Sequence, residues 1–188
     1  NDNLEDDKFY NFLFAAFVNM EQNMEHDASI YVFHADTEGL NFRRAFKAAG
    51  FYLSGTCIWK KQSLVLGRSP YQWQHEPILF GWKLGGKHMW YSDRKQSTIW
   101  EYDRPKKNDM HPTMKPVELV AYPIRNSSMS NCIVLDPFGG SGSTLIACEQ
   151  TGRICRTIEL DEKYLNSLLS VLEANLSYIP SSTSKKEL

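Results

Sequence analysis

Apolar residues near the start of the chain recur at the spacing of a helix. Over residues 5–24 they stand three or four positions apart, which predicts an amphipathic helix that packs on a sheet. The run Ile30-Tyr31-Val32-Phe33 is rich in β-branched and aromatic residues and predicts a short buried strand. The chain therefore begins as an alternation of helix and strand.

A second helix and a second strand are expected in residues 36–60. Asp36 or Thr37 can cap the helix and Gly50 can end it. A strand is then predicted from 51 to 60. The helix positions that we expect to face inward are Leu40, Ala45, Phe46 and Ala49.

Polar residues dominate the middle of the chain, so short elements are expected between loops. Glycine and proline mark loops at 61–75 and 83–97. The remaining pattern predicts strands at 77–82 and 98–102 and a helix at 117–125.

The clearest pattern lies near the C-terminal end. An apolar run, 132–136, leads into the glycine-rich segment 137–144 and then into a helix that ends near Gly152. A second strand, 154–159, and a helix from 161 to 178 follow. Strand, turn, helix and strand form a βαβ unit, which requires parallel strands. We therefore expect an α/β fold with a mixed, mostly parallel sheet and flanking helices.

Composition agrees with a globular protein. The 188 residues are 42% hydrophobic and 23% charged, which predicts a single domain over residues 1–180 followed by a tail at 181–188. No apolar run is long enough to span a bilayer and no signal peptide is recognisable, so a cytoplasmic protein without a membrane partner is expected. The four cysteines have no metal-ligand spacing, so no metal site is expected.

Charge is distributed unevenly although the net charge is −1. The charged residues of 1–29 are mainly acidic, whereas residues 60–107 carry ten Lys and Arg against four Asp and Glu. Tryptophan and tyrosine are interleaved with these cations. A basic, aromatic middle is typical of an electrostatic contact surface for nucleic acid, although the same aromatic residues also suit a protein core.

The glycine-rich turn predicts a nucleotide-like ligand, because glycines allow close backbone approach and a helix N-terminus favours an anionic group. No lysine lies between Asp136 and Thr144, which argues against a nucleoside-triphosphate loop. Gly140-Ser141-Gly142 lacks the third glycine of a dinucleotide site. S-adenosylmethionine (SAM) remains, and Glu159 follows Gly139 by roughly 20 positions, the spacing of a ribose-binding acid. Glu159 can also be read as a cap of the next helix.

Two segments resemble a known family. His111-Pro112-Thr113-Met114-Lys115-Pro116 and the turn from Asp136 to Thr144 are similar, in this order, to the permuted (beta-class) DNA amino-methyltransferases. Residues 157–164 also match the family's second strand. The resemblance implies a Rossmann-like, SAM-dependent methyltransferase of bacterial or phage restriction-modification type. It implies methylation of an amino group in duplex DNA, with adenine preferred over cytosine, and a homodimer as one assembly.

The resemblance also implies roles for residues. Lys115 and Thr113 would bind the methionine carboxylate, Glu159 the ribose, and Phe138 would flank the reacting methyl group. Without the family, the segment that holds Lys115 reads as a polar turn before a helix. The whole predicted cofactor site is Thr113, Lys115, Asp136, Phe138, Gly139, Gly140, Ser141, Gly142, Ser143, Thr144, Glu159 and Asp161. Candidate DNA contacts lie in 61–110, at Arg68, Lys87 and Arg94.

The sequence departs from the family at its catalytic motif. The family's Asp-Pro-Pro-Tyr, which orients the target amino group and stacks on a flipped base, does not occur in the 188 residues. We therefore expect a chain that is N-terminally incomplete, inactive alone and without catalytic residues of its own. The alternatives are a non-catalytic remnant that binds cofactor or DNA, and a methyltransferase that acts on RNA or a small molecule.

Overall fold

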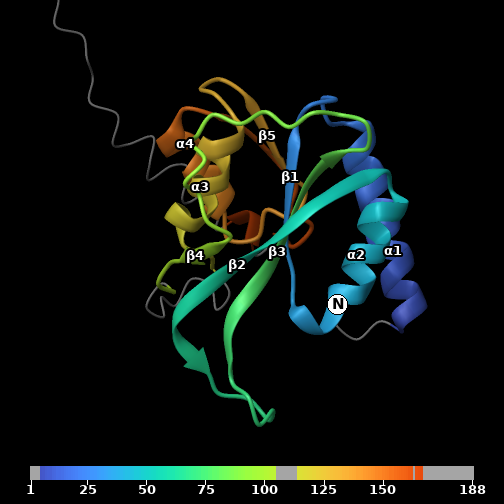
Figure 1. The fold of residues 1–188 in the computed structure, drawn as a ribbon, viewed down its shortest axis with the longest axis vertical. Coiled ribbons are helices and arrows are strands. Elements are labelled where there is room, and N and C mark those ends of the chain that lie inside the picture. The colour runs from blue at the N-terminus through green and yellow to red at the C-terminus, as the bar shows by residue number, and fades with distance from the viewer. Residues whose placement is uncertain (1–4, 105–113, 163, 167–188) are drawn as a thin grey trace, which may run out of the picture. The chain divides into compact units, whose positions relative to one another are not determined.

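The computed structural model describes residues 5–104, 114–162 and 164–166 (Figure 1). The chain divides into two compact units, Asn1–Arg104 with Tyr122–Met129 and Pro105–Ala121 with Ser130–Leu188. Each unit is described by itself below, and a single domain over 1–180 stays a prediction. No helix in the described ranges is long and apolar enough to cross a membrane.

A four-stranded sheet forms the centre of the first unit. Its strands are β1 (Ser29–Phe33), β2 (Phe51–Val65), β3 (Trp73–Lys83) and β4 (Ile99–Glu101), and their order is β1-β3-β2-β4. Both neighbours of β3 run antiparallel to it, while β4 runs parallel to β2. β2 and β3 form a long hairpin that occupies the two central positions of this sheet.

Two helices, α1 (Asp6–Gln22) and α2 (Gly39–Ala48), lie beside each other along the same side of this sheet (Figure 1). Their shared core is aromatic. Phe46 is fully buried, and its ring lies 5.7 Å from that of Phe17 and 4.9 Å from that of Phe51. Leu79 on β3 closes this cluster from the sheet side. Burial of such large rings is the main stabilising contribution in this unit.

The opposite face of the sheet is also aromatic. Tyr31 stacks on Phe80 with a ring separation of 4.8 Å, and its hydroxyl lies 2.7 Å from the Ser127 hydroxyl. Trp100 packs edge-on against Tyr122, at 5.0 Å. Ser127 and Tyr122 belong to α3 (Val117–Ser127), so the second half of that helix is tied to the first sheet. Burial raises the pKa of Tyr31, so its hydroxyl keeps its proton.

The second unit contains the predicted βαβ element. β5 (Ile133–Asp136) and β6 (Ile154–Thr157) are parallel and α4 (Ser143–Thr151) connects them. Gly152 ends α4 with a φ of +68°, the left-handed conformation of a helix C-terminus. The helix expected from 161 to 178 begins in residues 162–166, and its remainder lies outside the described residues.

One expected core position is wrong. Leu40 is 70% exposed, whereas its neighbour Asn41 is only 8% exposed. Residues Asp36–Glu38 form a 3-10 turn before α2, which changes the phase of the first helical turn. Ala45, Phe46 and Ala49 are buried as expected.

The predicted loop 61–75 is mostly strand, which corrects the sequence-based boundary. β2 continues to Val65 and β3 begins at Trp73, so only residues 66–72 connect them. A connection this short forces antiparallel pairing. The expected sheet was mostly parallel, but among the described residues two pairings are parallel and two are antiparallel.

Gly81 on β3 tests the packing between sheet and helices. A Cβ at this position would meet the Tyr52 carbonyl oxygen and would lie 2.9 Å from Phe46 Cζ. Gly81→Ala should therefore lower the free energy of unfolding by about 1–3 kcal/mol, measured by urea denaturation. The matched control is Gly55→Ala on β2, where nothing lies within 4 Å of the new Cβ. Equal unfolding midpoints for the two variants would contradict this packing.

Candidate functional site

The candidate site lies where β5 and β6 end. The two strands pair in register, and Asp136 on β5 stands opposite Thr157 on β6. Residues 137–142 leave one strand and residues 158–161 leave the other, so both segments start at the same edge. Ligands of open α/β sheets bind at this carboxyl edge.

Backbone hydrogen bonds shape the turn after β5. The Asp136 carboxylate accepts a hydrogen bond from the Phe138 N–H at 3.0 Å, and the Gly139 N–H donates to the Ile158 carbonyl at 2.9 Å. Gly140 and Gly142 have φ angles of +51° and +83°. These left-handed conformations strain other residues, which explains two of the glycines in the motif.

Glu159 joins the two segments. One carboxylate oxygen accepts a hydrogen bond from the Gly140 N–H at 2.7 Å, and the other accepts one from the Asp161 N–H at 2.8 Å. The side chain is half-buried. An acidic side chain thus holds the turn after β5 against the segment after β6.

The start of α4 is anchored from a different side. The Ser143 side chain is buried, and its hydroxyl donates to the Lys115 carbonyl oxygen at 2.8 Å. Gly142 precedes the helix and supplies no side-chain cap. No side chain at the N-cap position bonds the first backbone N–H groups of α4. This is the arrangement expected where a helix start receives a ligand.

The structure brings most of the predicted cofactor residues together at one edge of the sheet. The Ser143 hydroxyl already donates a hydrogen bond to a backbone carbonyl of the protein, that of Lys115. Phe138 is 57% exposed and Asp161 is exposed. Thr113 lies outside the described residues. The predicted residues grouped by the turn and by the end of β6 are Asp136, Phe138, Gly139, Gly140, Ser141, Gly142, Ser143, Thr144, Glu159 and Asp161.

The three candidate DNA contacts all lie in the first unit and are exposed, but on different segments. Arg68 belongs to the connection between β2 and β3, while Lys87 and Arg94 lie between β3 and β4. No contact between them is recorded within the described ranges.

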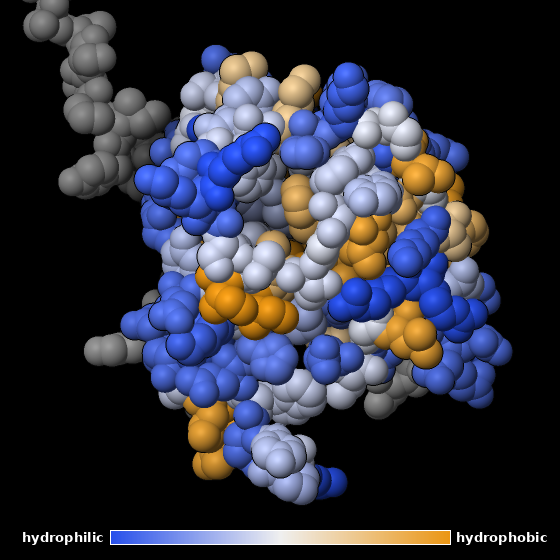
Figure 2. Space-filling view, viewed as in Figure 1, coloured by the Kyte–Doolittle hydropathy of each residue, from blue (hydrophilic) through white to orange (hydrophobic). Residues whose placement is uncertain are grey.

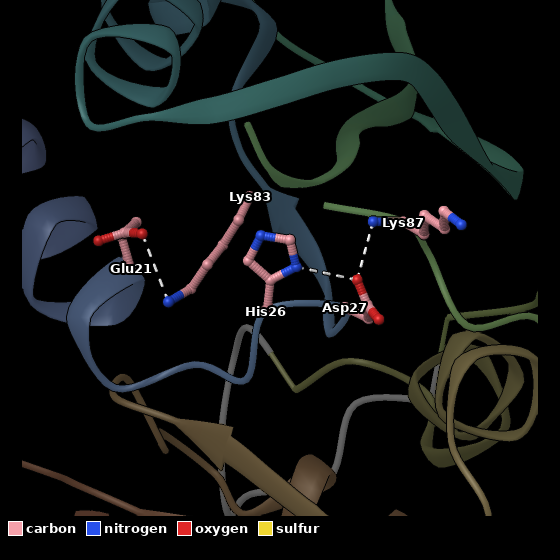
Figure 3. Close-up of polar contacts among 5 residues, drawn as sticks. All are labelled: Glu21, His26, Asp27, Lys83 and Lys87. Carbon is pink, nitrogen blue, oxygen red and sulfur yellow. Dashed lines mark hydrogen bonds and ion pairs between the residues drawn. The ribbon is translucent and has the colours of Figure 1, made fainter. Parts of the chain in front are cut away.

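Polar contacts hold the segment that carries Lys87 (Figure 3). The Asp27 carboxylate accepts a hydrogen bond from the Lys87 backbone N–H at 2.9 Å and lies 3.1 Å from His26 Nδ1. These hydrogen bonds lower the pKa of Asp27. Lys83 forms an ion pair with Glu21 of α1 at 3.3 Å. The hydrogen bond to Asp27 therefore holds the backbone of this segment, and the Lys87 side chain extends away from Asp27 (Figure 3).

Sequence reasoning missed a contact between two cysteines beside the site. Cys148 on α4 and Cys155 on β6 share a thiol hydrogen bond. This hydrogen bond lowers the pKa of Cys155, whereas it raises the pKa of Cys148. The sequence offered little sign of this contact, because no fixed number of residues separates a helix position from the strand position that it contacts.

Comparisons with known proteins show which family and which fold this chain resembles. A family model described as DNA methylase (N6_N4_Mtase) matches residues 1–170. The Escherichia coli protein YubD, which is named as a methylase, is 30% identical over 174 residues, covering 84% of this chain and 67% of YubD. The DNA adenine methyltransferase YhdJ of Escherichia coli is 24% identical over 207 residues, covering 93% of this chain and 70% of YhdJ.

A solved structure shares the fold. The M1.HpyAVI–SAM complex has a TM-score of 0.75 and 23% sequence identity, and the match covers 86% of this chain and 83% of that one. This confirms the Rossmann-like α/β methyltransferase fold. The chain spans 67% of the length of YubD and 54–56% of the type II methyltransferases M2.LlaDCHI of Lactococcus lactis and M2.DpnII of Streptococcus pneumoniae.

The cysteine pair allows a test of the electrostatics beside the site. Cys155 should react with iodoacetamide at pH 8 well before Cys148, because its pKa is lowered and Cys148 is only 1% exposed. Peptide mass spectrometry after timed labelling measures both rates. Cys148→Ala removes the hydrogen bond and should slow the labelling of Cys155. Faster labelling of Cys148 in the native chain would show that the thiols are arranged otherwise.

Proposed function

The chain belongs to the DNA methylase family, and we propose that it holds the SAM-binding part of a permuted (beta-class) DNA amino-methyltransferase. The observation that carries the proposal is the position of Glu159 at the end of β6, hydrogen-bonded to the glycine turn after β5. This arrangement puts a carboxylate beside the glycine turn at the carboxyl edge of a parallel strand pair, where ligands of open α/β sheets bind.

The chemistry of this carboxylate fits the ribose of SAM. Each oxygen of Glu159 accepts one backbone N–H, while a carboxylate offers about four acceptor sites. Two ribose hydroxyls can therefore donate to the remaining sites without breaking the turn. The Thr157 hydroxyl, at the end of β6, is buried and has no hydrogen-bond partner within the described part of the chain.

The opposite end of SAM would lie along the glycine turn and the start of α4. We assign the methionine portion to Asp136 and residues 139–144, with Lys115 and Thr113 binding its carboxylate and Asp161 lying toward the adenine. Ser143 would contribute through its backbone, because its hydroxyl is engaged with Lys115. SAM supplies an activated methyl group when bound, and the exposed ring of Phe138 would flank it.

The acceptor is proposed to be the amino group of adenine in duplex DNA, with the amino group of cytosine as the alternative. The name of YhdJ, a DNA adenine methyltransferase, supports adenine. We assign no catalytic residue, since the 188 residues contain no Asp-Pro-Pro-Tyr motif. Duplex DNA would be held by exposed cations in the segments 61–75 and 83–97, including Arg68, Lys87 and Arg94, and assembly as a homodimer stays a prediction.

Calorimetric titration tests the cofactor proposal. The full chain should bind SAM and not NAD, and Glu159→Ala should weaken SAM binding by about tenfold to a hundredfold, because hydrogen bonds to a charged group are lost. Glu149→Ala, at an exposed position on α4, is the matched control and should leave the affinity unchanged.

Two results would count against this assignment. Equal affinity of wild type and Glu159→Ala would remove Glu159 from the ribose site. Failure of the folded wild-type chain to bind SAM, with folding verified by circular dichroism, would refute the proposal that this chain alone holds the cofactor.

Salt dependence tests the DNA proposal. Arg68→Ala and Lys87→Ala should each reduce the slope of log K against log salt concentration by about one unit, as expected when one phosphate contact is lost. Fluorescence anisotropy with a labelled duplex measures the slope. Lys47→Ala, at an exposed position on α2, should not change it. An unchanged slope in the first two variants would place Arg68 and Lys87 outside the interface.

A further inference from the structure

The hairpin of β2 and β3 projects from the sheet and ends in a seven-residue tip, residues 66–72 (Figure 1). The last recorded strand pairing before the tip joins Val65 to Trp73. In Figure 1 the tip lies at the lower end of the hairpin, apart from α1 and α2.

Side-chain hydrogen bonds order the tip. The Gln72 side chain accepts a hydrogen bond from the Gly67 N–H at 2.6 Å and donates one to the Ser69 carbonyl. The loop is therefore closed by its own residues before any partner binds. Such preorganisation lowers the entropic cost of binding.

The ordered tip exposes apolar side chains. Tyr71 is 90% exposed and Leu66 is 84% exposed. Leu64, Val65 and Trp73, just before and after the tip, are 37–51% exposed. Figure 2 shows apolar residues in orange on this projection, at the bottom of the view. Single exposed apolar residues are common, but five within ten positions on one projection mark a contact surface.

The charge of the hairpin indicates an anionic partner. No acidic residue occurs between 61 and 75, and Arg68 lies within the tip. The two lysines at the base of the hairpin are already paired, Lys60 with Glu101 at 2.6 Å and Lys61 with Glu76 at 2.7 Å. Arg68 is thus the cation carried farthest along the hairpin, beside the exposed aromatic side chain.

Shape and chemistry together select duplex DNA as this partner. The major groove, about 12 Å wide, admits a two-stranded β-ribbon. Proteins that bind the minor groove can also insert apolar side chains between base steps and partly unstack them. An aromatic ring also stacks on any base, so the contact requires no particular sequence.

We propose that the tip of the β2–β3 hairpin is a wedge that inserts Tyr71 between neighbouring base pairs of duplex DNA, while Arg68 contacts a phosphate. This proposal rests on the proposed function and deepens it by assigning a task to the hairpin. Unstacking beside the target base would lower the cost of flipping that base out of the duplex.

Fluorescence of 2-aminopurine in duplex DNA tests the wedge, because this base brightens when it is unstacked. A set of duplexes with the probe at successive positions is titrated with the full chain at low salt, and binding is measured separately by anisotropy. Wild type should increase the fluorescence of at least one duplex severalfold at saturation. Tyr71→Ala should abolish this increase and weaken binding by about tenfold, while Tyr71→Phe should retain both.

Tyr52→Ala is the matched control, since Tyr52 is an exposed tyrosine near the start of β2, outside the segments 61–75 and 83–97. It should leave the fluorescence increase intact. Tyr71 is so exposed that its removal should not disturb folding, and circular dichroism verifies this.

The remaining outcomes overturn the inference in distinguishable ways. Binding without a fluorescence increase, or an increase that persists in Tyr71→Ala, refutes the wedge and leaves the DNA proposal standing. Absence of duplex binding refutes both. If Tyr71→Ala instead reduces self-association in sedimentation measurements and leaves DNA unaffected, the tip contacts a second copy of the chain and the wedge is wrong.

Discussion

The carboxylate of Glu159 is the constraint on which the candidate site depends. It accepts one N–H from Gly140 in the turn after β5 and one from Asp161 in the segment after β6. A single side chain thereby holds two backbone segments that come from different strands. The backbone bond from the Gly139 N–H to the Ile158 carbonyl joins the same two segments, and the carboxylate adds the contacts that satisfy the Gly140 and Asp161 N–H groups.

The parts of this site that the sequence could predict are those with a local cause. Gly140 and Gly142 were expected because a tight turn needs left-handed backbone, and both have positive φ. The parallel pairing of β5 with β6 followed from the βαβ pattern. The bond between Glu159 and Gly140 was not foreseen, since the sequence suggested Glu159 as a ribose ligand or as a cap of the next helix. Spacing along the chain predicts neighbours in a fold, but not which hydrogen bonds they share.

Elsewhere the predictions from the sequence pattern were wrong or incomplete at positions whose structure depends on tertiary packing. The segment 61–75 was read as a loop because it is mostly polar and contains Gly67 and Pro70, yet residues 61–65 continue β2. Residues 62–65 are exposed, so this part of the strand shows no apolar alternation. Leu40 was expected inside the core, but the 3-10 turn before α2 rotates it outward. The Cys148–Cys155 contact joins positions whose proximity only the packed unit defines.

The central claim is that the Glu159-linked turn binds SAM, and chemical-shift mapping tests it most directly. Addition of SAM to the ¹⁵N-labelled chain should shift the amide signals of Gly140 and Asp161 first, since both N–H groups donate to Glu159. Signals of α1 and α2 should stay in place. Shifts confined to residues outside 136–144 and 157–161, or no shifts at saturating SAM, would contradict the account.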